Sequence, residues 1–212
     1  MRCWSDRPRH RERKNDAMNF IEQEIAKTIG VMKQLLAEPA LMSALPATAE
    51  RCAASLRAGG KIMFCGNGGS AADSQHLAAE LVGKLLSHRP GIAGLALTTD
   101  SSALTAIAND FGYDYVFSRQ VEAIGRRGDV LIGLSTSGRS NNVVAAFKVA
   151  RAAGITTVAM TGVGGGDLAP LADFLIAVPS TETQKIQEAH IVLGHIFCAL
   201  IEAAIHGNGN PS

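Results

Sequence analysis

Aromatic residues and cysteines are both scarce in this chain of 212 residues. Aromatic side chains make up 5% of the sequence, so the expected core consists mainly of Ala, Leu, Ile and Val. The four cysteines show no spacing typical of a metal or redox site, which excludes a cysteine-based zinc site. Cysteines of this kind suit the reducing cytoplasm, where Cys acts as a small hydrophobic side chain. They are Cys3, Cys52, Cys65 and Cys198.

The sequence also lacks a long uninterrupted hydrophobic run. The longest apolar stretch, near the C-terminus, is interrupted by His190, His195 and Glu202, so no transmembrane helix is predicted. The basic residues at the N-terminus are not followed by an apolar segment, which excludes a secretory signal. We therefore expect no membrane partner and a cytoplasmic location.

Charge is low, and the excess of positive charge lies at one end. The formal net charge is +1, and residues 1–16 carry six basic and three acidic side chains, which leaves a net of −2 for the remainder. A mildly acidic body gives no electrostatic reason to expect a nucleic-acid partner. We interpret residues 1–17 as a disordered basic head, rather than as a nucleic-acid-binding arm, and residues 18–212 as a single domain.

From residue 60 onward, patterns typical of strands and of helices alternate. Short apolar runs bounded by glycines indicate strands, and the segments between them have helical periodicity. Such an alternation indicates a parallel sheet covered on both faces. We therefore predict an α/β fold, a doubly wound five-stranded parallel sheet, preceded by a pair of helices at 18–37 and 40–58. The strands are predicted at 61–65, 92–98, 129–134, 155–160 and 173–178, and the later helices at 70–86, 101–109, 113–125, 140–153 and 184–206.

A glycine-rich turn follows the first predicted strand. It contains Gly66, Asn67, Gly68, Gly69 and Ser70. Glycines let the backbone approach a ligand closely, and a helix N-terminus presents free N–H groups to an anion. We expect Ser70 to cap the following helix, with Asp73 three residues later as in a capping box.

His76 and Glu80 follow on the same predicted helix. Their spacing of four residues places both side chains on one face. Two interpretations are open: a metal-binding or acid–base pair, or a solvated pair on the helix surface. The apolar neighbours Leu77, Ala78 and Leu81 favour a partly buried pair, which suits proton transfer.

A second polar turn follows the strand predicted at 129–134. Residues 135–142 have the sequence Ser-Thr-Ser-Gly-Arg-Ser-Asn-Asn. Four hydroxyls and the N–H groups of the next helix suit a phosphate monoester. The alternative is an ordinary helix start with a Ser cap. Ligands of doubly wound sheets bind beyond the carboxyl ends of the strands, where both polar turns are predicted to lie.

A dinucleotide-binding dehydrogenase is an alternative function. The Walker A pattern is absent, but Gly66, Gly68 and Ala71 match a loose form of the dinucleotide fingerprint. That fingerprint requires an acidic residue about 20 positions further on. The acidic residue after the second predicted strand is Asp100, 34 positions after Gly66. This spacing makes the dehydrogenase the weaker alternative, and we expect no nucleotide cofactor.

The last predicted helix contains Gln187, Glu188, His190 and His195. At about 100° per residue, the two histidines are separated by roughly 140° and face different directions. Periodicity alone does not decide which histidine enters a pocket, or whether Gln187 or Glu188 accompanies it. A purely structural role is the alternative for each histidine.

Five motifs follow one another along the chain: CGNGGSAAD at 65–73, HLAAE at 76–80, ANDFG at 108–112, STSG at 135–138 and IQEAH at 186–190. Together and in this order they resemble the phosphoheptose isomerase family, the sedoheptulose 7-phosphate isomerases of the SIS (sugar isomerase) fold. The resemblance covers about residues 18–206 and implies a flavodoxin-like sheet.

The resemblance implies an activity and an assembly. The activity is the conversion of D-sedoheptulose 7-phosphate to D-glycero-D-manno-heptose 7-phosphate by proton transfer through an enediol. This is the first step of nucleotide-heptose synthesis for the lipopolysaccharide core. The implied assembly is a cytoplasmic homotetramer with active sites at the subunit interfaces.

The resemblance also implies roles for individual residues. Glu80 matches the family's general base, and His195 matches its acid/base partner. One zinc ion per subunit is implied, with His76, Glu80, Gln187 and His195 as ligands. The positions that match substrate contacts are Asn67, Gly68, Gly69, Ser70, Asp110, Ser135, Thr136, Ser137, Ser140 and Gln187.

A non-enzymatic SIS protein that binds the replication initiator is the alternative within this resemblance. That relative lacks the acid and the histidine that match Glu80 and His195. Both residues are present in this chain, which favours the enzyme.

Overall fold

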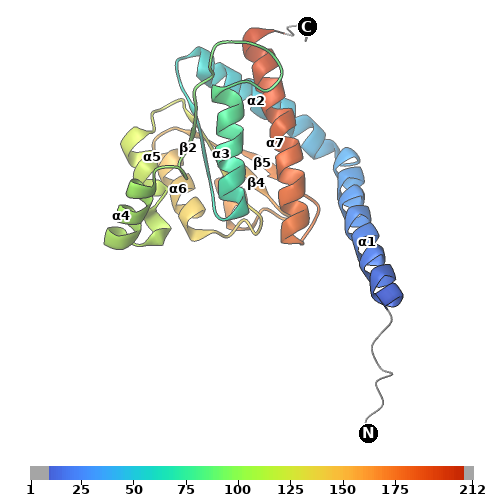
Figure 1. Cartoon of the computed structure of the whole chain (residues 1–212). Coiled ribbons are helices and arrows are strands. Elements are labelled where there is room, and N and C mark those ends of the chain that lie inside the picture. Colours follow the sequence, from blue (N-terminus) through green and yellow to red (C-terminus); the bar gives the residue numbers. More distant parts are fainter. Residues whose placement is uncertain (1–9, 208–212) are drawn as a thin grey trace.

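The computed structural model describes residues 10–207 (Figure 1). Two helices precede a sheet of five strands, and five further helices of more than one turn follow or separate the strands. The strands are β1 (Ile62–Gly66), β2 (Gly94–Ala96), β3 (Val130–Ser135), β4 (Thr156–Thr161) and β5 (Phe174–Ala177). The helices are α1 (His10–Leu36), α2 (Pro39–Arg57), α3 (Gly69–Val82), α4 (Ser101–Phe111), α5 (Ser118–Ile124), α6 (Asn141–Ala152) and α7 (Thr183–His206), with short 3-10 helices at η1 (Tyr113–Tyr115) and η2 (Gly166–Leu171).

The sheet has the strand order β2-β1-β3-β4-β5, and every pairing is parallel. The chain moves from β1 outward to β2 and then returns to the other side of β1 at β3. The strand order therefore reverses between β1 and β3, which is where doubly wound sheets bind ligands. Because Gly66 pairs with Leu134 in the register, the two polar turns that follow these strands lie side by side. The predicted fold class is confirmed.

Two apolar cores cover the two faces of the sheet. Alternate side chains of a strand point to opposite faces, so Phe64 and Ile132 enter one core while Met63 and Leu131 enter the other. The first core is completed by α2, α3 and α7, and the second by α4, α5 and α6. Burial on both faces explains why the central strands are continuously apolar.

Several element boundaries differ from the predicted ones; helix α3, for example, ends at Val82 and not at residue 86. The single helix predicted at 113–125 is divided into η1 and α5, because Val116 and Phe117 between them turn into the second core. The strand predicted at 92–98 is shortened to β2 at the edge of the sheet. Its expected first residue, Ile92, donates its N–H to the carbonyl of Leu81 in α3 and not to β1.

The N-terminal boundary also differs from the prediction. Helix α1 begins at His10, so residues 10–17 are helical and are not part of a disordered head. Arg, Glu, Lys and Ala are good helix formers, and they extend the helix predicted from residue 18 by several residues. The prediction for residues 1–9 lies outside the described residues.

Helix α1 projects from the body (Figure 1) and contacts α7. The attachment is centred on Lys185 of α7, which is 4% exposed and lies 3.2 Å from carboxylate oxygens of both Glu24 and Glu188. Lys185 also donates to Thr28 of α1, whose hydroxyl lies 2.6 Å from Glu188. This network joins α1 to the first turns of α7.

Within residues 10–207, α7 is the one helix that is long and apolar enough to cross a membrane by length and composition. The sequence predicts no transmembrane helix here, because His190, His195 and Glu202 interrupt the apolar stretch, yet the mean hydropathy of α7 is high enough for one. In the fold, α7 packs against α2 and α3, and Ile186, Leu193 and Phe197 lie in the first core. Core burial therefore accounts for its apolar composition.

Three of the cysteines behave as the predicted small hydrophobic side chains. Cys52 and Cys198 lie in the first core and Cys65 in the second, all as free thiols. Burial raises the pKa of Cys65 and of Cys198 to about 12, so neither is a reactive thiolate at neutral pH. Cys3 lies outside the described residues.

Candidate active site

The glycine-rich turn begins α3 earlier than predicted. The residue that precedes the helix is Gly68, with a φ of 57°, and no side chain caps the helix. The predicted Ser70 cap and its capping box with Asp73 are therefore wrong. Glycine tolerates a positive φ, so the helix can start at Gly69 and enclose Ser70 in its first turn, where it is 3% exposed.

His76, Glu80 and His195 form a cluster between α3 and α7. The Nε2 atoms of His76 and His195 are 2.8 Å apart, and the Nε2 of His76 lies 3.2 Å from a carboxylate oxygen of Glu80. The side chain of Glu80 is 17% exposed, whereas that of His76 is 47% exposed. The pair is therefore partly buried, and His195 adds a third group to it.

A glycine permits the two helices to approach closely at this cluster. A Cβ atom on Gly194 would lie 2.6 Å from a methyl carbon of Leu77. Gly194 is the neighbour of His195 in α7, and Leu77 is the neighbour of His76 in α3. The close contact of Gly194 with Leu77 therefore brings the two imidazole rings together. The sequence pattern of α7 alone contains no signal for this contact.

The cluster has the chemistry of a divalent-metal site. One ligand atom from each of the three residues lies within 4.8 Å of the others. Two imidazole nitrogens and a carboxylate oxygen are typical zinc ligands, and catalytic zinc sites commonly use three such groups and leave a further position for water or substrate. The residues present therefore fit the implied metal.

The fourth predicted ligand, Gln187 of α7, has its side chain next to Gly69, the first residue of α3. A Cβ atom on Gly69 would be 2.8 Å from the Nε2 atom of Gln187, so the glycine leaves room for the amide. Gln187 precedes His195 by two turns of α7, roughly 12 Å along the helix axis. Its membership of the metal site stays a prediction.

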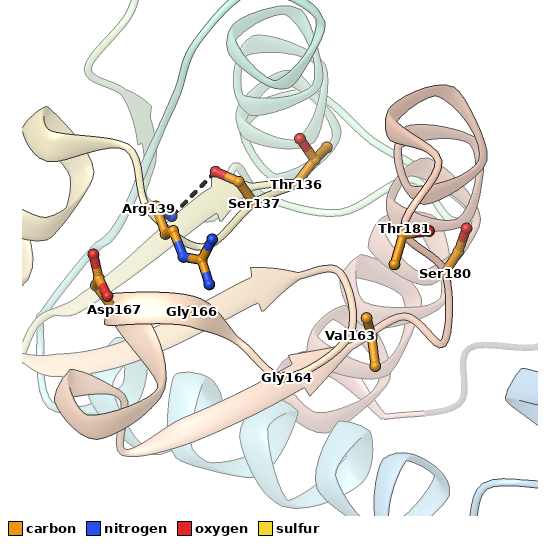
Figure 2. Close-up of a pocket in the computed structure, with 9 residues that line it drawn as sticks. All are labelled: Thr136, Ser137, Arg139, Val163, Gly164, Gly166, Asp167, Ser180 and Thr181. Carbon is orange, nitrogen blue, oxygen red and sulfur yellow. Dashed lines mark hydrogen bonds between the residues drawn. The ribbon is translucent and has the colours of Figure 1, made fainter.

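The second polar turn forms one wall of a hollow of about 560 Å³ (Figure 2). Ser135 and Ser140 are joined through their hydroxyls at 2.8 Å, and the backbone N–H of Arg139 donates to the Ser137 hydroxyl at 3.2 Å. Ser140 precedes α6 but does not cap it with its side chain. The ordinary Ser-cap alternative is thus not what this turn adopts. The residues that line the hollow are Thr136, Ser137, Arg139, Val163, Gly164, Gly166, Asp167, Ser180 and Thr181.

The turn after β4 holds this polar turn in place. Gly138 has a φ of 65°, and a Cβ atom there would collide with the carbonyl oxygen of Gly165. The backbones are linked by hydrogen bonds from Leu168 N to Gly138 O and from Gly162 N to Thr136 O, at 3.1 and 3.0 Å. Gly138, Gly165 and Gly166 therefore let the two turns approach closely, since a Cβ atom on Gly166 would lie 2.6 Å from the carbonyl oxygen of Ser137.

The predicted sugar contacts have different surroundings. Asn67 forms hydrogen bonds with the side chains of Asn142 and Tyr113, neither of which was predicted at the site by role. Asp110 is exposed and accepts a hydrogen bond from the neighbouring Asn109 at 2.7 Å. The residue that the dehydrogenase alternative required, Asp100, instead caps α4 by accepting from Ala103 N at 2.9 Å.

The two histidines of α7 occupy different environments, as their angular separation predicted. His195 lies in the cluster, whereas His190 is fully buried, with Nε2 3.1 Å from the carbonyl of Thr161. A carbonyl only accepts, so Nε2 of His190 carries the proton and donates it. His190 therefore has the structural role.

Burial makes His190 a source of acid sensitivity. Desolvation lowers the pKa of His190 from 6.5 to about 4, although the bond to Thr161 opposes this shift. As the pH falls, His190 takes up a proton near pH 6.5 in the unfolded chain but only near pH 4 in the folded chain. The free energy of unfolding therefore decreases as the pH falls from about 6.5 to 4. We expect wild type to lose about 2 kcal/mol relative to His190→Gln between pH 7 and pH 5. Urea unfolding at both pH values measures this, and parallel losses in the two proteins would contradict it.

Comparison with known proteins identifies the family. The SIS domain model matches residues 25–162. A phosphoheptose isomerase of Burkholderia pseudomallei (strain 1710b) is 51% identical over 193 residues, 91% of this chain and 98% of the relative. One of Akkermansia muciniphila is 54% identical over 179 residues, 84% of this chain and 95% of the relative. The solved phosphoheptose isomerase GmhA of Neisseria gonorrhoeae superimposes with a TM-score of 0.82 at 45% identity, covering 88% of this chain and 99% of that one. The chain belongs to the phosphoheptose isomerase family of SIS-domain proteins.

Proposed function

We propose that this chain is an aldose–ketose isomerase that converts D-sedoheptulose 7-phosphate to D-glycero-D-manno-heptose 7-phosphate. The observation that carries the proposal is the convergence of His76, Glu80 and His195 between α3 and α7, in a fold whose two polar turns follow neighbouring strands. The identity of about one half to relatives named phosphoheptose isomerase supports it. The product begins nucleotide-heptose synthesis for the lipopolysaccharide core.

The isomerisation needs two proton transfers, one at carbon and one at oxygen. Glu80 removes the proton from C1 of the ketose and returns it to C2 of the aldose. His195 supplies a proton to the oxygen on C2 and accepts one from the oxygen on C1, so the enediol forms and collapses with no net proton consumed. Two groups with separate acid and base roles are what such a reaction requires.

The same cluster is proposed to hold one zinc ion per subunit through His76, Glu80, Gln187 and His195. When bound, zinc polarises the sugar oxygens next to the reacting carbons. The three clustered donor atoms support this assignment. Thiolate ligands are not part of the set, so the metal should be removable by a chelator without unfolding the chain.

We expect His76→Ala to lose the metal and most of the activity while the melting temperature stays nearly unchanged. The reason is that the side chain of His76 is half exposed and lies outside both cores. Elemental analysis together with thermal unfolding measures both effects. Full metal occupancy in His76→Ala would place the metal elsewhere.

The polar turn at 135–140 is proposed to bind the substrate phosphate. We expect the double variant Ser137→Ala, Ser140→Ala to raise KM by about 100-fold, because two hydrogen bonds to a charged group are lost. Arg139→Ala is the matched comparison, since its guanidinium lines the same hollow (Figure 2). An equal or larger rise in KM for Arg139→Ala would make the arginine the phosphate anchor.

A cytoplasmic homotetramer with interfacial sites completes the proposal. Support for association comes from large apolar side chains of α1 that are 49–63% exposed on the projecting helix. A second copy would remove this surface from water, and burial of apolar area is the main force in such association. The exposed apolar side chains of α1 are Met18, Phe20, Ile21, Ile25 and Ile29. Light scattering of the purified chain measures the assembly.

One assay tests the proposed function. The purified protein is incubated with sedoheptulose 7-phosphate, with and without chelator, and the aldose phosphate is measured. We expect product without chelator and much less product with it. The absence of product in both conditions, and after zinc is added back, would favour the non-enzymatic relative that binds the replication initiator.

A further inference from the structure

Asn67 connects the two polar turns through a pair of hydrogen bonds. It follows β1, and its partner Asn142 lies in the first turn of α6, which follows β3. Asn67 Nδ2 lies 2.9 Å from Asn142 Oδ1, and Asn142 Nδ2 lies 2.9 Å from Asn67 Oδ1. The two amides therefore bond reciprocally across the point where the strand order reverses.

A backbone N–H fixes the orientation of both amides. Val143 N lies 2.9 Å from Asn142 Oδ1, and a backbone N–H can only donate, so the atom at this position must be the oxygen. The oxygen of Asn142 then accepts from Asn67 Nδ2, and the oxygen of Asn67 faces Asn142 Nδ2. Exchanging oxygen and nitrogen in either amide would oppose two donors.

Tyr113 completes the set. Its hydroxyl lies 3.1 Å from Asn67 Oδ1, and because that atom is now assigned as the oxygen, the hydroxyl must donate. Both lone pairs of Asn67 Oδ1 are then occupied, one by Asn142 and one by Tyr113. One N–H of Asn67 has no partner among the side chains and backbone that the structure describes.

We propose that Tyr113 is a positioning residue that, together with Asn142, makes Asn67 present an N–H and not an oxygen to the ligand. The ligand group at this position must then be an acceptor, such as a sugar hydroxyl oxygen or a phosphate oxygen. The proposal rests on the proposed function in taking a sugar phosphate as the ligand. It adds two residues to the site, and neither acts on the reacting atoms.

Tyr115 provides a matched control. Tyr113 and Tyr115 are 58% and 51% exposed and lie two residues apart in η1. The hydroxyl of Tyr115 forms no side-chain hydrogen bond within the described part of the chain. Removing each hydroxyl with Phe therefore changes the same group, in similar exposure, with and without a bond to Asn67.

The test measures the Kd of sedoheptulose 7-phosphate by calorimetry and KM and kcat by assay. We expect Tyr113→Phe to raise Kd and KM about 3- to 10-fold, with kcat and melting temperature nearly unchanged, because one hydrogen bond that orients Asn67 is lost. Tyr115→Phe should match wild type. In an Asn67→Ala background, Tyr113→Phe should have no further effect on Kd, because its action passes through Asn67.

Three outcomes would overturn the positioning role. They are an unchanged Kd in Tyr113→Phe, an equal rise in Tyr115→Phe, or an effect of Tyr113→Phe that persists without the Asn67 side chain. The last outcome would make Tyr113 a direct ligand contact. If the wild-type protein binds the sugar phosphate but does not isomerise it, the proposed function is contradicted. The Kd values of Tyr113→Phe, Asn67→Ala and the double variant would still decide the role of Tyr113.

Discussion

Replacing Glu80 with Gln is expected to lower kcat for sedoheptulose 7-phosphate by a factor of about 100 to 10,000, the usual contribution of a general base. An amide cannot take the proton from C1, but it has the shape of the carboxylate. It can still bond to the Nε2 atom of His76, which lies 3.2 Å from Glu80. The fold and the binding of sugar phosphate should therefore persist. Steady-state kinetics and calorimetric binding on the same preparation measure the two effects.

Loss of the metal must be separated from loss of the base. Activity of Glu80→Gln is therefore measured with added zinc and with metal content determined. Full recovery of kcat at full occupancy would mean that Glu80 serves only as a ligand. Glu122→Gln, at an exposed position of α5, is the control and should keep wild-type activity. Near-normal turnover in Glu80→Gln without added zinc would remove Glu80 from both roles.

Replacing Glu202 with Ala is expected to destabilise the fold by about 3–5 kcal/mol, because it leaves a buried charge without its partner. Glu202 of α7 is 4% exposed and pairs with Arg89 at 3.0 Å. It also accepts from the backbone and hydroxyl of Ser87, at 2.8 and 2.6 Å. Arg89 in turn donates to the carbonyl of Glu80 at 2.8 Å, so the pair ties the segment after α3 to the end of the helix that carries the proposed base.

Chemical denaturation measures this effect, and Glu122→Ala is the comparison. Glu122 pairs with Arg119 at 3.7 Å with both side chains about half exposed, so its loss should cost at most about 1 kcal/mol. A cost for Glu202→Ala no larger than that for Glu122→Ala would contradict the prediction.

The pair also gives an acid dependence. Burial by itself would raise the pKa of Glu202, but hydrogen bonds from Ser87, Arg89 and Leu85 hold this pKa at about 2, below the usual 4.5. The contribution of Glu202 to stability is therefore complete above pH 4.5 and is lost as the pH falls toward 2. Glu202→Ala should show a smaller loss of stability than wild type over this interval.

Most of the sheet could be predicted because its strands are short, apolar and separated by helices. The expected ends of β1, β3 and β4 are within one residue of the observed ones. The limits of strand β2 and of the helices on either side of Val116 were harder to predict from the sequence. Strand β2 lies at the edge of the sheet and has one partner strand, β1. Its first residue depends on where the hydrogen bond of the preceding segment to α3, from Ile92 N to Leu81 O, ends. The divided helix depends on two buried side chains whose destination, the second core, is a tertiary feature.

The sequence by itself determined the periodicities, the glycine turns at two strand ends and the shared face of His76 and Glu80, because these depend on local geometry and on covalent order. Tertiary structure decided which histidine of α7 faces that pair. The choice depends on the close contact of Gly194 with Leu77, two residues 117 positions apart. Tertiary structure also decided the hydrogen-bond polarity of Asn67, because Asn67, Tyr113 and the first turn of α6 with Asn142 and Val143 are three separate segments of the chain. Residues distant in the chain meet only when the sheet has formed, so no local pattern can encode their contact.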